Sequence, residues 1–137
     1  MFEIYDFIQG KIPVLIHCGD YRYDFSHPKR LVNILNLFPN LTVIAAHFGG
    51  WSIWDETLDY LLNQNCYLDT SSSFVNLGKE KSLKLVKAYG AERLVFGVDF
   101  PMGSHKKELD MFFNLDLSDE ENSLILSQNS KNILNLT

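Results

Sequence analysis

The sequence predicts an α/β fold in which four parallel strands alternate with helices. Four short runs are almost continuously apolar and rich in Val, Ile and Leu, a pattern typical of parallel strands buried on both faces. Segments with helical periodicity separate these runs, and this alternation implies a parallel sheet with right-handed crossovers. The periodicity alone fits a doubly wound open sheet and part of a barrel equally well. The predicted strands are residues 12–16, 41–46, 66–68 and 94–98.

The first two segments between the predicted strands carry helix-start signals. Residues 26–38 begin with Ser26 as a candidate N-cap and repeat apolar residues at helical spacing. Residues 52–63 begin with Ser52 and Asp55, a pair that is similar to a capping box. Both segments are therefore predicted to be amphipathic helices that pack on the sheet.

The helical signals continue to the end of the chain. Residues 79–89 present one apolar face, and Gly90 is a suitable helix stop. Ser118 and Glu121 form a capping box, which predicts an extra C-terminal helix after the last βα unit. No linker or low-complexity segment interrupts the order, so we expect one domain over residues 1–137. The remaining helical signals cover residues 2–9 and 104–115, and residues 130–136 are predicted to form a short terminal turn.

The composition of the 137 residues excludes several classes of protein. A net charge of −5 provides no basic face to neutralise phosphates, which argues against nucleic-acid binding. The longest apolar runs are too short to span a bilayer, and no basic region precedes an apolar one at the start, as a signal peptide requires. Cys18 and Cys66 have no metal-binding or redox spacing. Together these features predict a cytoplasmic protein with reduced thiols.

Polar residues follow each predicted strand at the point where it ends. His17 follows the first strand, His47 the second, Asp69 the third and Asp99 the fourth. The carboxyl ends of parallel strands lie on one rim, where the active sites of open α/β sheets and of βα barrels are found. Imidazole and carboxylate groups bind divalent metals and transfer protons. The rim is therefore the predicted site of chemistry.

Several of these polar residues also have ordinary structural explanations. A single histidine at a strand end is often a satisfied structural residue. Asp69 precedes a Thr-Ser-Ser-Ser run and is suited to cap that turn, and Asp20 is suited to pair with Arg22 in a turn. The residues interpreted as structural, through helix starts or packing, are His27, His105, Trp51 and Trp54.

Four motifs in this order resemble a known family. They are PVLIHCGD (13–20), VIAAHFGGW (43–51), YLDTSSS (67–73) and RLVFGVDFP (93–101), followed by a terminal SQNSKNILNL (127–136). They resemble the last four strands of the amidohydrolase-related, metal-dependent hydrolases, which have a TIM-barrel fold. The resemblance covers essentially the whole chain. It implies that the four βα units and the C-terminal helix form half of a (β/α)8 barrel.

The resemblance also implies a function and a set of site residues. Family members hydrolyse C–N and C–O bonds, and some decarboxylate aromatic or unsaturated acids. The resemblance therefore implies a small-molecule substrate. By correspondence, His17 is a metal ligand and Asp99 is a metal ligand that also accepts a proton from the attacking water. His47 is a second metal ligand, or it polarises or protonates the substrate. The implied cofactor is a divalent metal, Zn²⁺ or Mn²⁺.

The sequence departs from the family pattern in one important respect. The family's first strand carries a His-x-His pair, and this sequence has none, since its histidines are at 17, 27, 47 and 105. A complete barrel needs about 250 residues, and the first four βα units are absent. We therefore expect a homodimer, with Asp99 of one subunit near His17 of its partner, or a complementary N-terminal half. The remaining alternative is that the four strands flatten into a small open sheet with helices on both faces. The alternative function is a catalytically inactive remnant or a subunit for another chain.

Overall fold

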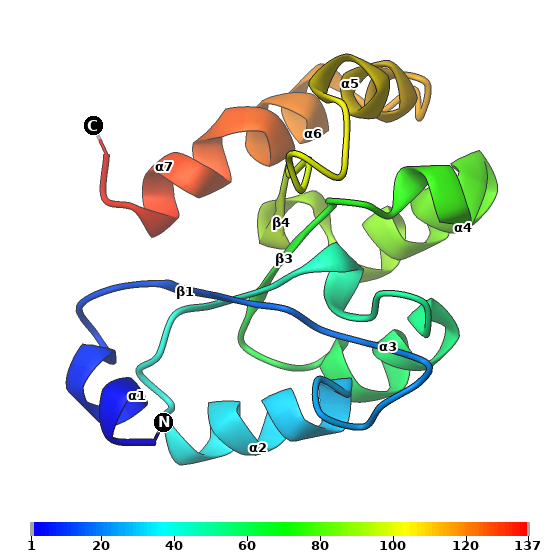
Figure 1. Cartoon of the computed structure of the whole chain (residues 1–137). Coiled ribbons are helices and arrows are strands. Elements are labelled where there is room, and N and C mark those ends of the chain that lie inside the picture. Colours follow the sequence, from blue (N-terminus) through cyan, green and yellow to red (C-terminus); the bar gives the residue numbers. More distant parts are fainter. Residues whose placement is uncertain (1, 137) are drawn as a thin grey trace.

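Four parallel strands form the centre of the molecule, as a computed structural model of residues 2–136 shows (Figure 1). The strand order is β1-β2-β3-β4, and each neighbouring pair is parallel. This arrangement confirms the predicted α/β class with four consecutive parallel strands. The strands are β1 (Val14–Ile16), β2 (Val43–Ala45), β3 (Tyr67–Asp69) and β4 (Leu94–Val95).

The helices follow one another around the outside of this sheet, from α2 at the bottom of Figure 1 through α3 and α4 to α5, α6 and α7 at the top. In the described part of the chain, no helix combines the length and the apolar character that crossing a membrane requires. The helices are α1 (Phe2–Ile8), α2 (Pro28–Leu37), α3 (Trp54–Leu61), α4 (Phe74–Tyr89), α5 (His105–Phe113), α6 (Asp119–Ser123) and α7 (Asn129–Ile133). The short turns are η1 (His47–Gly49), η2 (Ala91–Arg93) and the π-helical η3 (Leu124–Gln128).

The two faces of the sheet have different surroundings. Val43, Leu68 and Leu94 are completely buried and belong to the main apolar core. Their neighbours along the strands point the other way, and Leu15 is 62% exposed although it lies in a strand. Leu15 and its register partner Ile44 line a pocket on that second face. Among residues 2–136, β1 and β4 are the edge strands, and neither has a partner on its outer side.

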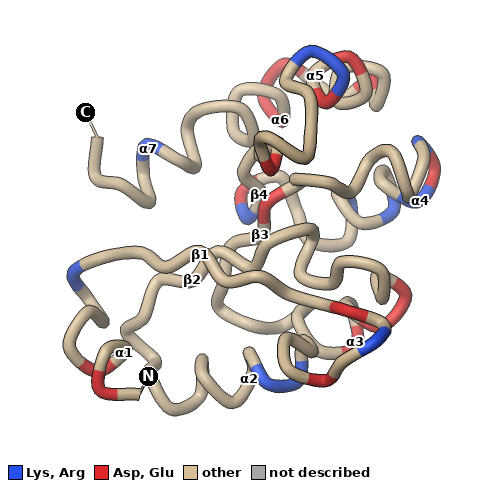
Figure 2. The backbone as a smooth tube through the Cα atoms, in the orientation of Figure 1, with Lys and Arg blue, Asp and Glu red and all other residues tan. Residues whose placement is uncertain are grey.

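Charged residues lie mainly on the helices and loops, with both signs interspersed along the backbone (Figure 2). Within the four strands of the described chain, Asp69 is the single charged residue. A carboxylate at the end of an otherwise apolar strand needs polar partners, because burying it without them is costly. Its partners belong to the candidate site.

Two of the predicted helix starts are wrong. The N-cap of α2 is His27 instead of Ser26, because the Nδ1 atom of His27 accepts a hydrogen bond from the backbone N–H of Lys29 at 3.1 Å. Ser52 does not cap α3, which begins after Ile53 without a side-chain cap. The Ser52 hydroxyl oxygen instead accepts from the backbone N–H of Tyr21 at 2.9 Å. The Ser26 hydroxyl donates to the carbonyl oxygen of Gly19 at 3.2 Å, so both serines hold the loop after β1.

Other helix signals are confirmed or extended. Gly90 ends α4 with a φ of 83°, and Ser118 with Glu121 forms the predicted capping box. Helix α4 begins earlier than predicted, at Phe74, and is interrupted at Gly78, where φ is 70° and ψ is 176°. The last strand is shorter than predicted, because the backbone N–H of Phe96 leaves the sheet and donates to the carbonyl oxygen of Ile125 at 2.8 Å.

Arg93 secures the amino ends of the last two strands. Its guanidinium group donates to the carbonyl oxygens of Leu61, Leu62, Gln64 and Cys66, at distances from 2.5 to 3.1 Å. Leu61 and Leu62 lie at the end of α3, where helical carbonyls have no partner within the helix. One side chain therefore completes the end of a helix and ties it to the start of β3 and β4.

Candidate functional site

The carboxyl ends of the strands open onto one pocket of about 480 Å³. His17 follows β1, His47 follows β2, Asp69 ends β3 and Asp99 lies in the loop after β4. All four line this pocket, together with Ser71 and apolar residues of the strands. The structure therefore places the residues predicted at the rim around one space. Their individual roles stay predictions.

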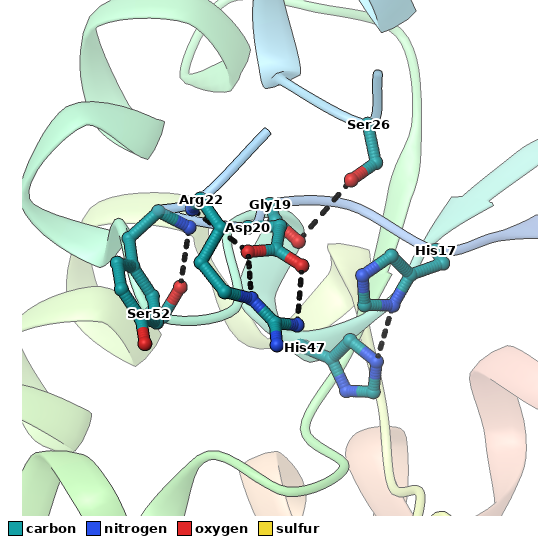
Figure 3. Close-up of polar contacts among 8 residues, drawn as sticks. His17, Gly19, Asp20, Arg22, Ser26, His47 and Ser52 are labelled. Atoms are coloured by element: carbon teal, nitrogen blue, oxygen red, sulfur yellow. Dashed lines mark hydrogen bonds and ion pairs between the residues drawn. The ribbon is translucent and has the colours of Figure 1, made fainter. Parts of the chain in front are cut away.

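The two histidines of the rim are in direct contact (Figure 3). The Nε2 atom of His47 lies 3.0 Å from the Nδ1 atom of His17, and the ring centroids are 5.0 Å apart at 68°. His47 is buried, whereas His17 is exposed to the open side of the pocket. One imidazole is thus held inside the protein and presents one nitrogen to a second, more accessible imidazole.

A left-handed turn directs His47 into the pocket. The backbone φ is 61° at His47 and 50° at Phe48, in a region that residues other than glycine rarely adopt. The turn is supported by a hydrogen bond from the backbone N–H of His47 to Asp69 Oδ1 at 2.8 Å. Trp54 donates its ring N–H to the carbonyl oxygen of His47 at 2.9 Å, and Phe48 is completely buried. Surrounding contacts stabilise the strained backbone, as is common at functional sites.

Asp69 caps the turn that follows β3, as predicted, and also contacts the site. Its Oδ1 atom accepts from the backbone N–H of Ser71 at 2.9 Å and from the Ser71 hydroxyl at 2.6 Å. The hydroxyl and carbonyl oxygens of Ser71 lie 2.9 and 3.0 Å from His47 Nδ1. Ser71 is not among the site residues that the sequence predicts. The Asp-x-Ser spacing is the signal that points to it, because an aspartate accepts from the backbone two residues later.

Asp99 lies on the opposite side of the pocket lining. It is exposed, has a φ of 63° and accepts a hydrogen bond at Oδ2 from the hydroxyl of Ser72 at 2.8 Å. Within residues 2–136, no three His, Cys, Asp or Glu side chains lie close enough together to hold a metal ion. Imidazole and carboxylate donors fit a divalent metal chemically. The described residues therefore fall short of the three protein ligands that catalytic zinc sites usually have.

Other predicted contacts near the rim are structural. Asp20 and Arg22 form the expected ion pair at 2.8 Å (Figure 3), and the hydrogen bond from Arg22 lowers the pKa of Asp20 to about 2. Burial raises the pKa of Cys18 to about 12, so this residue remains a thiol at neutral pH. His27 caps α2 and lies 3.2 Å from a carboxylate oxygen of Glu56. These residues shape the loops beside the pocket.

Known proteins share this arrangement of strands. The model of the amidohydrolase family matches residues 8–136. The chain belongs to the amidohydrolase family. Decarboxylase orsB of Emericella nidulans is 24% identical to this amidohydrolase-family chain over 153 residues, which cover 90% of the chain and 45% of that protein.

Two solved structures show the same fold. The uncharacterized TIM-barrel protein Bb4693 from Bordetella bronchiseptica matches with a TM-score of 0.82 and 25% identity, over 98% of this chain and 50% of that one. A dihydroxybenzoic acid decarboxylase from Polaromonas sp. JS666, with bound manganese and the inhibitor 2-nitroresorcinol, matches with a TM-score of 0.62 and 24% identity. That match covers 80% of this chain and 39% of the decarboxylase.

These matches confirm the predicted half barrel. The four βα units and the C-terminal helices superpose on part of a TIM barrel, and the chain spans about half the length of the relatives it matches. The choice between an open sheet and part of a barrel, which periodicity left open, is thereby resolved in favour of the barrel. The exposed Leu15 is explained as well, since its face of the sheet is the one that faces the inside of a barrel.

Proposed function

We propose that this chain contributes the C-terminal half of a metal-dependent hydrolase or decarboxylase that acts on a small molecule. The observation that carries the proposal is the pocket at the strand ends, where His17 and His47 are in contact and Asp99 shares the lining. These residue types at this place in a family member are what metal-assisted cleavage requires. The decarboxylases among the matched proteins support decarboxylation as one of the two reactions.

The residues have distinct proposed roles. His17 and Asp99 would hold a divalent metal, because one supplies an imidazole nitrogen and the other a carboxylate. A divalent metal supplies Lewis acidity to such reactions. Asp99, exposed at the mouth of the pocket, would accept a proton from water in a hydrolysis. His47, buried behind His17, would orient the substrate or donate a proton to it.

A second polypeptide segment would complete the site. The edge strands β1 and β4 have unpaired outer sides within the described chain, and the ligand set is incomplete there. Unpaired parallel edges are templates for further strands. Either a second copy, with its β1 beside β4, or a complementary half of four βα units would close the barrel. Light scattering of the chain purified alone separates the two, because a symmetric dimer has twice the mass of the 15.8 kDa chain, whereas a chain that needs a different half does not form that dimer.

The deciding experiment measures metal content and activity together. The purified chain, in its native assembly, is loaded with Mn²⁺ or Zn²⁺ and analysed for metal beside His17→Ala and Asp99→Ala. We expect stoichiometric metal that is lost in both variants. Carbon dioxide release from dihydroxybenzoates and hydrolysis of lactones and amides then distinguish the two reactions. A closed barrel that binds no metal would contradict the proposal and support a non-catalytic subunit.

A further inference from the structure

The surroundings of His47 Nδ1 define which atoms there carry protons. Two oxygens of Ser71 approach this nitrogen, the carbonyl at 3.0 Å and the hydroxyl at 2.9 Å. A carbonyl oxygen can only accept a hydrogen bond. The hydroxyl has one proton, which it donates to Asp69 Oδ1 at 2.6 Å. Both oxygens therefore face His47 as acceptors, and Nδ1 must be the donor.

The same carboxylate also fixes the backbone of the histidine. Asp69 Oδ1 accepts the backbone N–H of His47 at 2.8 Å and that of Ser71 at 2.9 Å. His47, Asp69 and Ser71 are all buried. Bulk water therefore does not compete for these groups, and their mutual hydrogen bonds decide the protonated positions.

We propose that Asp69 and Ser71 are positioning residues that hold His47 in its Nδ1–H tautomer, with an unprotonated Nε2 directed at His17. Asp69 occupies the only proton of the Ser71 hydroxyl, which leaves that oxygen as an acceptor for His47. If Asp69 were absent, the hydroxyl would be able to rotate and donate to Nδ1, and the proton of the ring would then be accommodated on Nε2.

The arrangement gives the hydrogen-bond chain one direction. In the neutral pair, His17 Nδ1–H donates to His47 Nε2, which lies 3.0 Å away. His47 Nδ1–H donates to Ser71, and Ser71 donates to Asp69. All three protons point toward the buried carboxylate, so the lone pair of His17 Nε2 is left for the open side of the pocket.

The tautomer of His47 has a role in catalysis only through the proposed function, on which this role rests. An unprotonated ring nitrogen is the form that binds a metal or accepts a proton, and a hydrogen bond at the other nitrogen commonly selects that form in metal sites. To protonate the substrate, His47 would therefore first accept a proton at Nε2. The tautomer itself is measured on the metal-free chain without substrate. Its failure can therefore be distinguished from failure of the proposed activity.

Nitrogen NMR of the ¹⁵N-labelled, metal-free chain tests the inference at about pH 8, above the ordinary pKa of imidazole. Couplings from the ring carbon protons to the two ring nitrogens identify the tautomer, and His47→Gln assigns the signals. We expect His47 to be Nδ1–H in the wild type. In Asp69→Ala we expect the ratio of Nε2–H to Nδ1–H to rise roughly threefold to tenfold, which corresponds to the net free energy of one hydrogen bond.

Three further variants make the test independent of folding. Asp69→Asn keeps an acceptor oxygen and is expected to retain the wild-type tautomer. Ser71→Ala removes the hydroxyl acceptor and lowers the preference, whereas Ser82→Ala leaves it unchanged. Ser82 is a matched control, because it is equally buried and its hydroxyl donates to the carbonyl oxygen of Gly78, away from the pocket.

Two results would overturn the proposal. A wild-type ring protonated on Nε2 overturns the proposal even if Asp69→Ala does not fold, and so does a tautomer ratio that is the same in Ser71→Ala as in Ser82→Ala. Mn²⁺ affinity, measured by calorimetry on the same samples, is expected to fall about 10- to 100-fold in Asp69→Ala, as for other residues that orient metal ligands. If the tautomer responds but no metal binds, the positioning stands and the proposed function fails.

Discussion

His17 and His47 are 30 positions apart in the sequence, yet Nδ1 of one lies 3.0 Å from Nε2 of the other. The contact forms because β1 and β2 are parallel neighbours in register, Ile16 opposite Ala45, so that the residues after them reach the same rim. In the proposed pair the two imidazoles share one proton at this contact, and the other ring nitrogen of His17 is left for a metal. The first prediction tests this second role of His17.

We predict that His17→Ala weakens binding of Mn²⁺ or Zn²⁺ by more than about tenfold, since it removes a proposed ligand. His105→Ala is the matched control, because His105 is also exposed but lies in α5, outside the pocket lining. Isothermal titration calorimetry of the native assembly measures both affinities. Equal affinities of the two variants would contradict the role given to His17.

The ion pair beside the rim predicts a pH dependence. The pKa of Asp20 is lowered from 3.8 to about 2 by Arg22, so the pair contributes stability above the ordinary pKa and loses it as the pH falls from about 4 to about 2. We expect an NMR titration of the Asp20 carboxyl to show a midpoint near 2, which moves toward 3.8 in Arg22→Ala. Arg30→Ala is the control, because Arg30 is equally exposed and pairs with Asp24. A midpoint that does not respond to Arg22 would refute this explanation.

Alanine substitution of two adjacent phenylalanines is expected to change the free energy of unfolding by very different amounts. Phe112 is completely buried and packs against Phe74 and Phe96, whereas Phe113 is 55% exposed. Phe112→Ala should lower the free energy of unfolding by about 3–5 kcal/mol, because it removes apolar contacts and leaves a cavity. Phe113→Ala should cost less than about 1 kcal/mol. Urea unfolding measures both, and similar losses would show that α5 does not pack as described.

The loop after His17 depends on a glycine. Gly19 has a φ of 89°, and a Cβ atom there would lie 2.4 Å from the backbone nitrogen of Trp51. Gly10 has a similar φ of 72° but open space around its Cβ position. We expect Gly10→Ala to cost about 1–2 kcal/mol of unfolding free energy, from backbone strain alone.

Gly19→Ala adds a clash with backbone, and we expect it to cost at least about 2 kcal/mol more than Gly10→Ala. The displaced loop is next to His17, so metal affinity should fall as well. Thermal unfolding and calorimetry on the same samples check both effects. A variant as stable as Gly10→Ala would show that the loop can move away without penalty.

The strands were predictable from the sequence because buried parallel strands have a simple signal. Continuous apolar runs identified all four, and their order followed from the alternation with helices. The end of β4 was not predictable, since it depends on Phe96 donating its N–H to Ile125, a contact with a distant turn. The two wrong helix caps failed for a similar reason. Ser52 has the right residue type for a cap, but its hydroxyl is occupied by Tyr21 of another loop.

The site was predictable in part for a geometrical reason. Topology alone places His17, His47, Asp69 and Asp99 on one rim, and the pocket contains all four. The contact of Ser71 with His47 was not predictable, because it requires the left-handed backbone at His47 and the turn capped by Asp69. Such a contact is a property of two loops together. Neither loop shows it in its own sequence.

Arg93 gathers four carbonyl oxygens at the amino ends of β3 and β4, at the opposite end of the sheet from the pocket. The two ends of the sheet are thus separate, one held together by Arg93 and one that lines the pocket. Substitution of side chains that line the pocket therefore leaves the Arg93 contacts intact, and reinforcement around Arg93 leaves the pocket unchanged. Under the proposed function, a fold divided in this way can change its substrate while these contacts persist.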